Sequence, residues 1–307
     1  MCIAPAPANI TGMIEVRELI KDYGDKRAVN QLSFIARPGM VTGFVGPKGS
    51  GKSTTMRIIL GLDTPTSGTA LVNGRRQSAL ERPMQTVGAM LDVKAPPGDC
   101  TAVDHLRFLG RESSIGPRRV TEVLQKVELS EMADKRVSEL PHRLRQRLGV
   151  AGALLSDPGV LLLDEPMRGL GAEDIQWSRD LMQSLADEGR TVLVSSNQMQ
   201  DMALTADQLL IINHGELIME AATAELIERF HRDVLVRSPR RSGLTRVLTD
   251  MGATVRAESG GGLSVTGIDS WRIASVAAEH HIPIQELTPR TRSLENIYQE
   301  LTGIAAG

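Results

Sequence analysis

Short runs of alternating apolar and polar residues open the patterned part of the chain. They cover Ile14 to Leu19, Leu32 to Phe34 and Val41 to Val45, and the turn-forming pair Pro38-Gly39 separates the last two. A period of two is typical of strands, so we expect an antiparallel edge sheet here. The segment Ala70 to Val72, followed by Asn73-Gly74, predicts a hairpin at the same edge, because both turn residues tolerate positive φ.

The pattern changes to helical spacing between Thr101 and Ser156. Apolar residues there recur at intervals of three and four, which predicts an inserted helical region. Continuous apolar runs return at Val160 to Leu163, Val192 to Val194 and Leu209 to Ile212, with helical stretches between them. Apolar strands that alternate with helices are typical of a buried parallel sheet, so the sequence predicts an α/β fold.

Beyond about residue 229 the pattern starts again and indicates a second domain. Its expected elements are strand Asp233 to Arg237, helix Arg241 to Met251, strand Thr254 to Ala257, strand Leu263 to Thr266, helix Ser270 to His280, strand Ile282 to Leu287 and helix Ser293 to Leu301. This βαββαβα order predicts a small α+β domain of the ferredoxin-like type. We expect a flexible tail over 1–12, a first domain over 13–228 with its helical region at about 92–155, and a C-terminal domain over 229–307.

Composition and charge exclude several classes of protein. Of the 307 residues 41% are hydrophobic and 23% are charged, and 35 basic against 37 acidic side chains leave a formal net charge of -2. No global positive field favours nucleic acid, and Leu263 to Thr266 lacks the aromatic side chains of an RNA-binding strand. Cys2 and Cys100 cannot supply a zinc site or a disulfide framework. No run approaches the ~20 apolar residues of a membrane-spanning helix, and no secretory signal is apparent, so we expect a cytoplasmic chain.

The strongest chemical signal is the segment Gly46-Pro47-Lys48-Gly49-Ser50-Gly51-Lys52-Ser53, which matches the pattern GxxxxGK[ST]. It lies between the strand Val41 to Val45 and an amphipathic stretch that starts at Thr54. Glycines let backbone N–H groups turn toward an anion, and the dipole of the following helix strengthens the attraction. Lys52 can then reach the β and γ phosphates of a nucleotide, and Ser53 can ligate Mg²⁺. The alternative is a glycine turn without a ligand.

A pair of carboxylates ends an apolar strand further along the chain. In Val160-Leu161-Leu162-Leu163-Asp164-Glu165 the acids follow a buried run, where uncompensated charge is costly. Asp164 is suited to hold Mg²⁺, and Glu165 is suited to polarise a water molecule. An ordinary strand end with solvated acids is the alternative.

These motifs and their order resemble the nucleotide-binding subunit of ATP-binding-cassette (ABC) transporters, especially the branch that exports drugs, antibiotics or lipids. The resemblance covers about residues 13–226 and includes Arg145-Gln146-Arg147-Leu148 and Leu163-Asp164-Glu165-Pro166. It implies a P-loop NTPase cassette with an antiparallel edge sheet and a helical subdomain. The implied ligands are ATP and Mg²⁺, with nucleotide contacts from Tyr23, Asp92, Asn197 and the loop residues Gly46, Pro47, Lys48, Gly49, Ser50, Gly51, Lys52, Ser53 and Thr54.

The resemblance also assigns roles. Tyr23 stacks on adenine, Ser53 and Asp164 hold the metal, and Lys52 and Glu165 are the catalytic residues. Taken alone, Tyr23 fits an ordinary edge aromatic equally well.

Four positions depart from the family pattern. Asp92 replaces the Q-loop glutamine, and Leu140-Pro141-His142-Arg143-Leu144 replaces the signature LSGGQ. Gly171 replaces the D-loop aspartate, and Asn197 replaces the switch histidine. Proline removes a hydroxyl and an N–H group, and an asparagine amide has no ionisable proton at neutral pH. Together the departures predict impaired hydrolysis, with Arg143 as a substitute phosphate ligand in the alternative hypothesis.

The family assignment implies protein partners. Transport requires a separate transmembrane permease subunit that holds the chain on the inner face of the cell membrane, and two cassettes sandwich two ATP molecules. The second cassette is either another copy or a different chain with an intact signature. A catalytically inactive, nucleotide-responsive regulatory or dimerisation module is the other hypothesis. A soluble ABC protein acting on ribosomes or DNA is disfavoured, because a single GxxxxGK[ST] and no sustained heptads occur.

Overall fold

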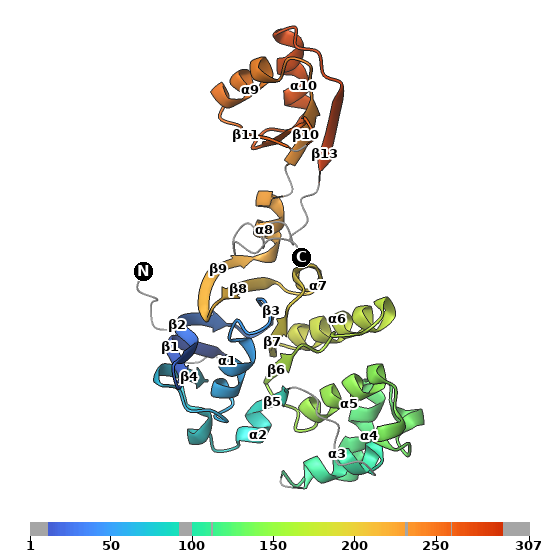
Figure 1. The fold of residues 1–307 in the computed structure, drawn as a ribbon. Coiled ribbons are helices and arrows are strands. Elements are labelled where there is room, and N and C mark those ends of the chain that lie inside the picture. The colour runs from blue at the N-terminus through green and yellow to red at the C-terminus, as the bar shows by residue number, and fades with distance from the viewer. Residues whose placement is uncertain (1–11, 92–99, 112, 231–232, 259, 291–307) are drawn as a thin grey trace. The chain divides into compact units, whose positions relative to one another are not determined.

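The computed structural model describes residues 12–91, 100–111, 113–230, 233–258 and 260–290, which form two compact units that divide between Ala221 and Ala222 (Figure 1). Most of the expected flexible tail lies outside these ranges. Gly12 is a correction to that expectation, because its N–H donates to the Asn73 side chain and its carbonyl accepts from the Thr191 hydroxyl. These two bonds fix Gly12 to the first unit.

The first unit contains an antiparallel sheet and a larger, mainly parallel sheet. The antiparallel sheet has the order β2-β1-β4, formed by β1 (Ile14–Tyr23), β2 (Lys26–Ala36) and β4 (Ser67–Val72). Asn73 and Gly74 both have positive φ, as the turn prediction requires, but the expected hairpin ends in a single bridge between Val72 and Arg75. The strand β4 therefore pairs with β1 rather than with a strand after the turn.

The second sheet has the order β5-β6-β7-β3-β8-β9. Its strands are β3 (Met40–Val45), β5 (Val87–Met90), β6 (Val160–Asp164), β7 (Thr191–Ser196), β8 (Gln208–Asn213) and β9 (Glu216–Ala222). The predicted parallel strands are confirmed as β6, β7 and β8. The placement of Val41–Val45 in the antiparallel edge sheet was wrong: β3 lies between β7 and β8, because a run buried at every position needs cover on both faces.

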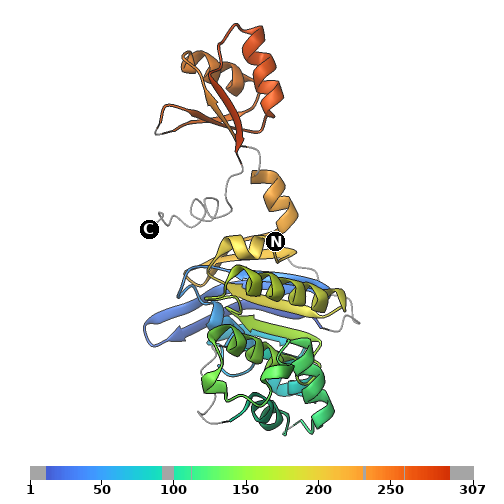
Figure 2. The same cartoon turned by 90° about the vertical axis from the view of Figure 1, so that its right-hand side faces the viewer.

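Helices position the loop and cover the sheets. Helix α1 (Lys52–Ile59) packs against β2 and β4 of one sheet and β6 of the other, so it lies between them. Helix α6 (Ala172–Asp187) packs on β3 and β7, and α5 (His142–Leu154) packs on β5 and β6. Figures 1 and 2 show α5 gathered with α3 (Ala102–Gly110) and α4 (Pro117–Lys126) in one green lobe, the helical region that the spacing predicts.

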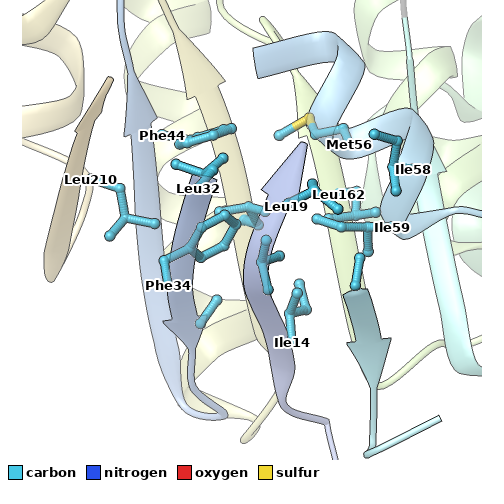
Figure 3. Close-up of a cluster of buried hydrophobic side chains, with 14 of the residues drawn as sticks. Ile14, Leu19, Leu32, Phe34, Phe44, Met56, Ile58, Ile59, Leu162 and Leu210 are labelled. Atoms are coloured by element: carbon cyan, nitrogen blue, oxygen red, sulfur yellow. The ribbon is translucent and has the colours of Figure 1, made fainter. Parts of the chain in front are cut away.

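The hydrophobic core of this unit fills the space between α1 and the two sheets. Figure 3 shows Met56 and Ile59 of α1 reaching toward Leu162 of β6 and Leu19 of β1. The rings of Phe34 and Phe44 join the sheets, with 5.4 Å between their centroids. The helix that follows the glycine-rich loop is thus fixed by close packing and not by the loop alone.

The second unit has its own sheet and core. Its antiparallel sheet has the order β11-β12-β10-β13, formed by β10 (Asp233–Arg237), β11 (Thr254–Ala257), β12 (Leu263–Thr266) and β13 (Glu286–Arg290). Helices α9 (Arg241–Asp250) and α10 (Ser270–Glu279) supply Leu244, Leu248 and Ile273 to the core. This is the predicted ferredoxin-like βαββαβ arrangement.

One boundary in this unit was wrong. The last strand was expected at Ile282 to Leu287 but begins at Glu286, because Ile282 packs into the core and Pro283 has no N–H to donate to a ladder. The expected final helix, Ser293 to Leu301, lies outside the described residues. Helix α8 (Thr223–Phe230) belongs to this unit, which starts at Ala222.

We predict that Met56→Ala costs about 2–5 kcal/mol of unfolding free energy, because it leaves a cavity between α1 and the sheets. Met84→Ala is the matched control: Met84 is 53% exposed whereas Met56 is 0% exposed. Urea unfolding measures both variants. Equal losses would show that the core under the loop is not tightly packed.

A second prediction concerns His105 on α3. Burial lowers the pKa of His105 below its ordinary value of 6.5, so the unfolded chain binds the proton more tightly than the folded one. The contribution of His105 to the free energy of unfolding is therefore fully present above pH 6.5, and it is lost as the pH falls below that value. Unfolding titrations in this range test the prediction. His105→Gln should flatten the pH dependence, and His214→Gln, at an exposed histidine, is the matched comparison.

Candidate nucleotide-binding site

The glycine-rich loop between β3 and α1 follows a path that only glycine permits at several points. Gly49 has φ 84° and Gly51 has φ 104°, both in the left-handed region. A Cβ atom at Gly46 would lie 2.5 Å from the Ile212 carbonyl oxygen, and one at Gly51 would lie 2.5 Å from that of Ala28. The loop therefore packs directly against the backbone of β8 and β2.

Hydrogen bonds hold this loop at the carboxyl end of the parallel sheet. The Gly46 N–H donates to the Ser196 carbonyl at 3.2 Å, and the Ser50 carbonyl accepts from the Gly215 N–H at 3.0 Å. Helix α1 begins at the end of the loop without an acidic residue in its first turn. No carboxylate of the first turn neutralises the N-terminal N–H groups or the helix dipole, and both therefore favour an anion.

Lys52 is the buried cation of the site. Its Nζ donates to the carbonyls of Gly46 at 2.6 Å and Pro47 at 3.0 Å, and the residue is 5% exposed. Burial lowers the pKa of Lys52, whereas the charges of Glu165 and Asp164 act in the opposite direction. The glycine-rich loop and the acids Asp164 and Glu165 are distant in sequence, and both stabilise the Lys52 ammonium group.

The two carboxylates lie at the end of β6 and are organised by Ser195 of β7. The Ser195 hydroxyl donates to Asp164 and accepts the Glu165 N–H at 2.9 Å. Asp164 pairs with Ser195 in the sheet register, and Glu165 has φ 49°, which turns the chain sharply after the strand. Sequence reasoning missed Ser195, because its role comes from the neighbouring strand and the pair Ser195-Ser196 was the only signal.

The remaining predicted residues differ in position. Ser53 is exposed. Asn197 is also exposed and follows β7 directly, next to Ser196, whose carbonyl accepts from the Gly46 N–H. Tyr23 is 48% exposed, and its hydroxyl donates to Asp63. Asp92 lies outside the described residues.

The residues present fit a triphosphate with a divalent cation. The Ser50 hydroxyl is buried in the loop and has no hydrogen-bond partner among the residues described, so it is an unused donor toward an anion. No group of three or more acidic, histidine or cysteine side chains in the described ranges could hold a metal alone. Magnesium usually keeps water ligands and binds one or two carboxylates together with phosphates, and Asp164 with Ser53 suits that mode.

Comparison with known proteins identifies the family. The profile of the ABC transporter family matches residues 29–168. The Nod factor export ATP-binding protein I of Cupriavidus metallidurans is 34% identical over 227 residues, covering 71% of this chain and 74% of that protein. The chain belongs to the ABC transporter family.

Two further similarities concern nearly the full length of the chain and the fold of the first unit. An uncharacterised ABC transporter ATP-binding protein of Bacillus subtilis is 28% identical over 296 residues, covering 94% of this chain and 95% of that protein. The solved structure of an ATP-binding subunit of an ABC transporter matches the fold with a TM-score of 0.63 at 21% identity, over 71% of this chain and 93% of that one. The C-terminal unit matches a domain of unknown function, DUF8746, over residues 232–295.

The ABC cassette therefore binds a nucleotide, as predicted, and the predicted P-loop NTPase fold is confirmed. Within the described parts of the chain, no helix combines the length and the hydrophobicity that crossing a membrane requires.

The signature position of this cassette has an unusual local structure. Helix α5 begins at His142, with Pro141 as its N-cap and no side-chain cap. His142 Nε2 lies 2.9 Å from the Arg168 carbonyl oxygen, so the imidazole contacts the chain segment after Glu165. Arg143 is exposed and makes no ion pair or hydrogen bond with the residues described. A proline, an imidazole ring and an exposed guanidinium thus stand at the positions that the sequence predicts to correspond to the signature.

We predict that Lys52→Ala abolishes ATP binding, because the ammonium is the buried positive charge of the loop. Lys48→Ala is the control: Lys48 is exposed on the same loop and its backbone N–H is retained in the variant. Titration with a fluorescent ATP analogue measures both. If Lys52→Ala binds as well as the unmodified protein, the loop is not the nucleotide site.

Proposed function

We propose that this chain is the ATP-binding subunit of an exporter, and that it couples ATP binding to transport through a separate transmembrane permease subunit. The name of the Cupriavidus relative, a Nod factor export ATP-binding protein, supports an export role. On this proposal the protein is held at the inner face of the cell membrane by the permease. The transported substrate is recognised by the permease and not by this chain.

Part of the support for a permease partner comes from the helical lobe. Helix α3 exposes two consecutive apolar side chains, with Phe108 66% and Leu109 37% exposed. Apolar side chains on a surface are favoured where a partner covers them.

Each residue of the nucleotide site has a task in the proposed activity. Loop N–H groups and Lys52 bind the β and γ phosphates, and Tyr23 stacks on the adenine. Mg²⁺, held by Ser53 and Asp164, would neutralise charge that develops on the phosphates. Ser195 fixes the orientation of Asp164, and Glu165 accepts a hydrogen bond from the attacking water. These contacts suffice for binding, and they supply the base for hydrolysis.

The observation that carries the proposal is the contrast between two parts of the cassette. The loop and the acids form an ordered site around Lys52, whereas the start of α5 presents Pro141, His142 and Arg143. In a homodimer, both ATP molecules would face this altered end. We therefore propose a different cassette with an intact signature as the second subunit, which completes the site containing Lys52 and Glu165.

This proposal predicts slow hydrolysis by the isolated chain despite normal ATP binding. Hydrolysis needs donors aimed at the developing charge, and losing the signature and switch contacts costs about 4 kcal/mol, or about a thousandfold in rate. Glu165→Gln should then have little effect on the isolated protein. Phosphate release by purified protein measures both rates.

A repaired variant provides the matched comparison. It combines Pro141→Ser, His142→Gly, Arg143→Gly and Asn197→His, and it keeps the buried Leu144. We expect faster turnover that becomes sensitive to Glu165→Gln. Rapid, Glu165-dependent turnover by the unmodified chain would contradict the proposal and point to Arg143 as a working substitute. An inactive repaired variant that still binds ATP would favour the regulatory module.

A further inference from the structure

The phenol of Tyr23 is bonded to a polar cluster on the phosphate-loop helix and the turn that follows it. Tyr23 Oη donates to Asp63 Oδ2 at 2.8 Å. The same carboxylate accepts from Arg57 of α1, at 2.8 Å from Nε and 3.2 Å from Nη2. A planar guanidinium that makes two bonds fixes the carboxylate in orientation as well as in position.

Electrostatics keep both partners of this contact in the required protonation state. Arg57 lowers the pKa of Asp63, so the carboxylate remains ionised and accepts. Burial raises the pKa of Tyr23, the hydrogen bond to Asp63 raises it further, and Thr54 acts in the opposite sense. The phenol therefore keeps its proton and donates at neutral pH.

The two faces of the Tyr23 ring differ. Lys21 Nζ lies 4.7 Å from the ring centroid, and it is held there by a 2.7 Å hydrogen bond to the Thr64 carbonyl. A cation over the ring is stabilised by the negative potential of that face. With Lys21 over one face, an incoming base has the opposite face of a half-exposed ring on which to stack.

We propose that Asp63 is a positioning residue for the nucleotide base. Asp63 accepts the hydrogen bond from the Tyr23 hydroxyl, and Arg57 ties Asp63 to α1, the helix that follows the phosphate loop. The Tyr23 ring is therefore oriented before ATP binds. The inference rests on the proposed function, in which Tyr23 stacks on adenine. Binding then avoids the entropy cost of ordering the aromatic side chain, which predicts an affinity gain of about two- to tenfold.

The test is a double-mutant cycle on the full chain, with Tyr23→Phe, Asp63→Ala and the two combined. Calorimetry measures the Kd for Mg·ATP and, separately, for inorganic tripolyphosphate, which has no base. Each single variant should weaken ATP binding about two- to tenfold, and the double variant should be no weaker than either, because both remove one interaction. Tripolyphosphate binding should be unchanged in all three. Asp22→Ala is the control, because Asp22 pairs with Arg27 and not with the ring.

The outcomes separate this inference from the proposed function. If Tyr23→Ala weakens ATP binding but Tyr23→Phe and Asp63→Ala do not, adenine stacking holds and the positioning role is wrong. If Tyr23→Ala has no effect on ATP affinity, the stacking contact itself is wrong. Additive losses in the double variant, or weaker tripolyphosphate binding, would show that Asp63 acts on the helix and not on the ring.

Discussion

The buried ammonium of Lys52 is the constraint on which the rest of the first unit depends. A cation at 5% exposure needs acceptors and nearby negative charge, or it loses its proton. Two loop carbonyls supply the acceptors, and Asp164 and Glu165 supply the charge. Because the acids end β6 and the loop leaves β3, the order β6-β7-β3 brings both to one edge of the sheet. The strand between them contributes Ser195, whose hydroxyl donates to the Asp164 carboxylate and accepts from the Glu165 backbone N–H.

This geometry also requires a rigid support. Helix α1 has to keep Lys52 and Ser53 in place while its other face packs between two sheets, and Met56 and Ile59 provide that contact. The same helix holds Arg57, which anchors the Asp63 and Tyr23 cluster. One helix thus links the hydrophobic core, the phosphate loop and the aromatic ring. The start of α5 is a separate region, whose altered residues leave this support intact.

Local signals made most of the nucleotide site predictable, whereas contacts between distant segments were not. The loop could be predicted because the pattern GxxxxGK[ST] lies directly between a strand and a helix, and the acids because they follow an apolar run. Ser195 and the contact of His142 with Arg168 depend on strand order and helix placement. The same holds for Arg147, which bonds Glu128 and Asp174 and lies 4.1 Å over the Trp177 ring. The sequence placed β3 in the wrong sheet, because alternation within a short run does not show whether one face or both faces of a strand are covered.

On the function we propose, this cassette binds ATP by itself but cannot complete a hydrolytic site with a second copy of itself. We test this by sedimentation velocity of the full chain carrying Glu165→Gln, which removes the proposed base, with and without saturating Mg·ATP. We expect one bound nucleotide per chain and the same sedimentation coefficient in both conditions. A nucleotide-dependent homodimer that holds two ATP molecules would contradict it, because Pro141, His142 and Arg143 would then be serving as a working signature.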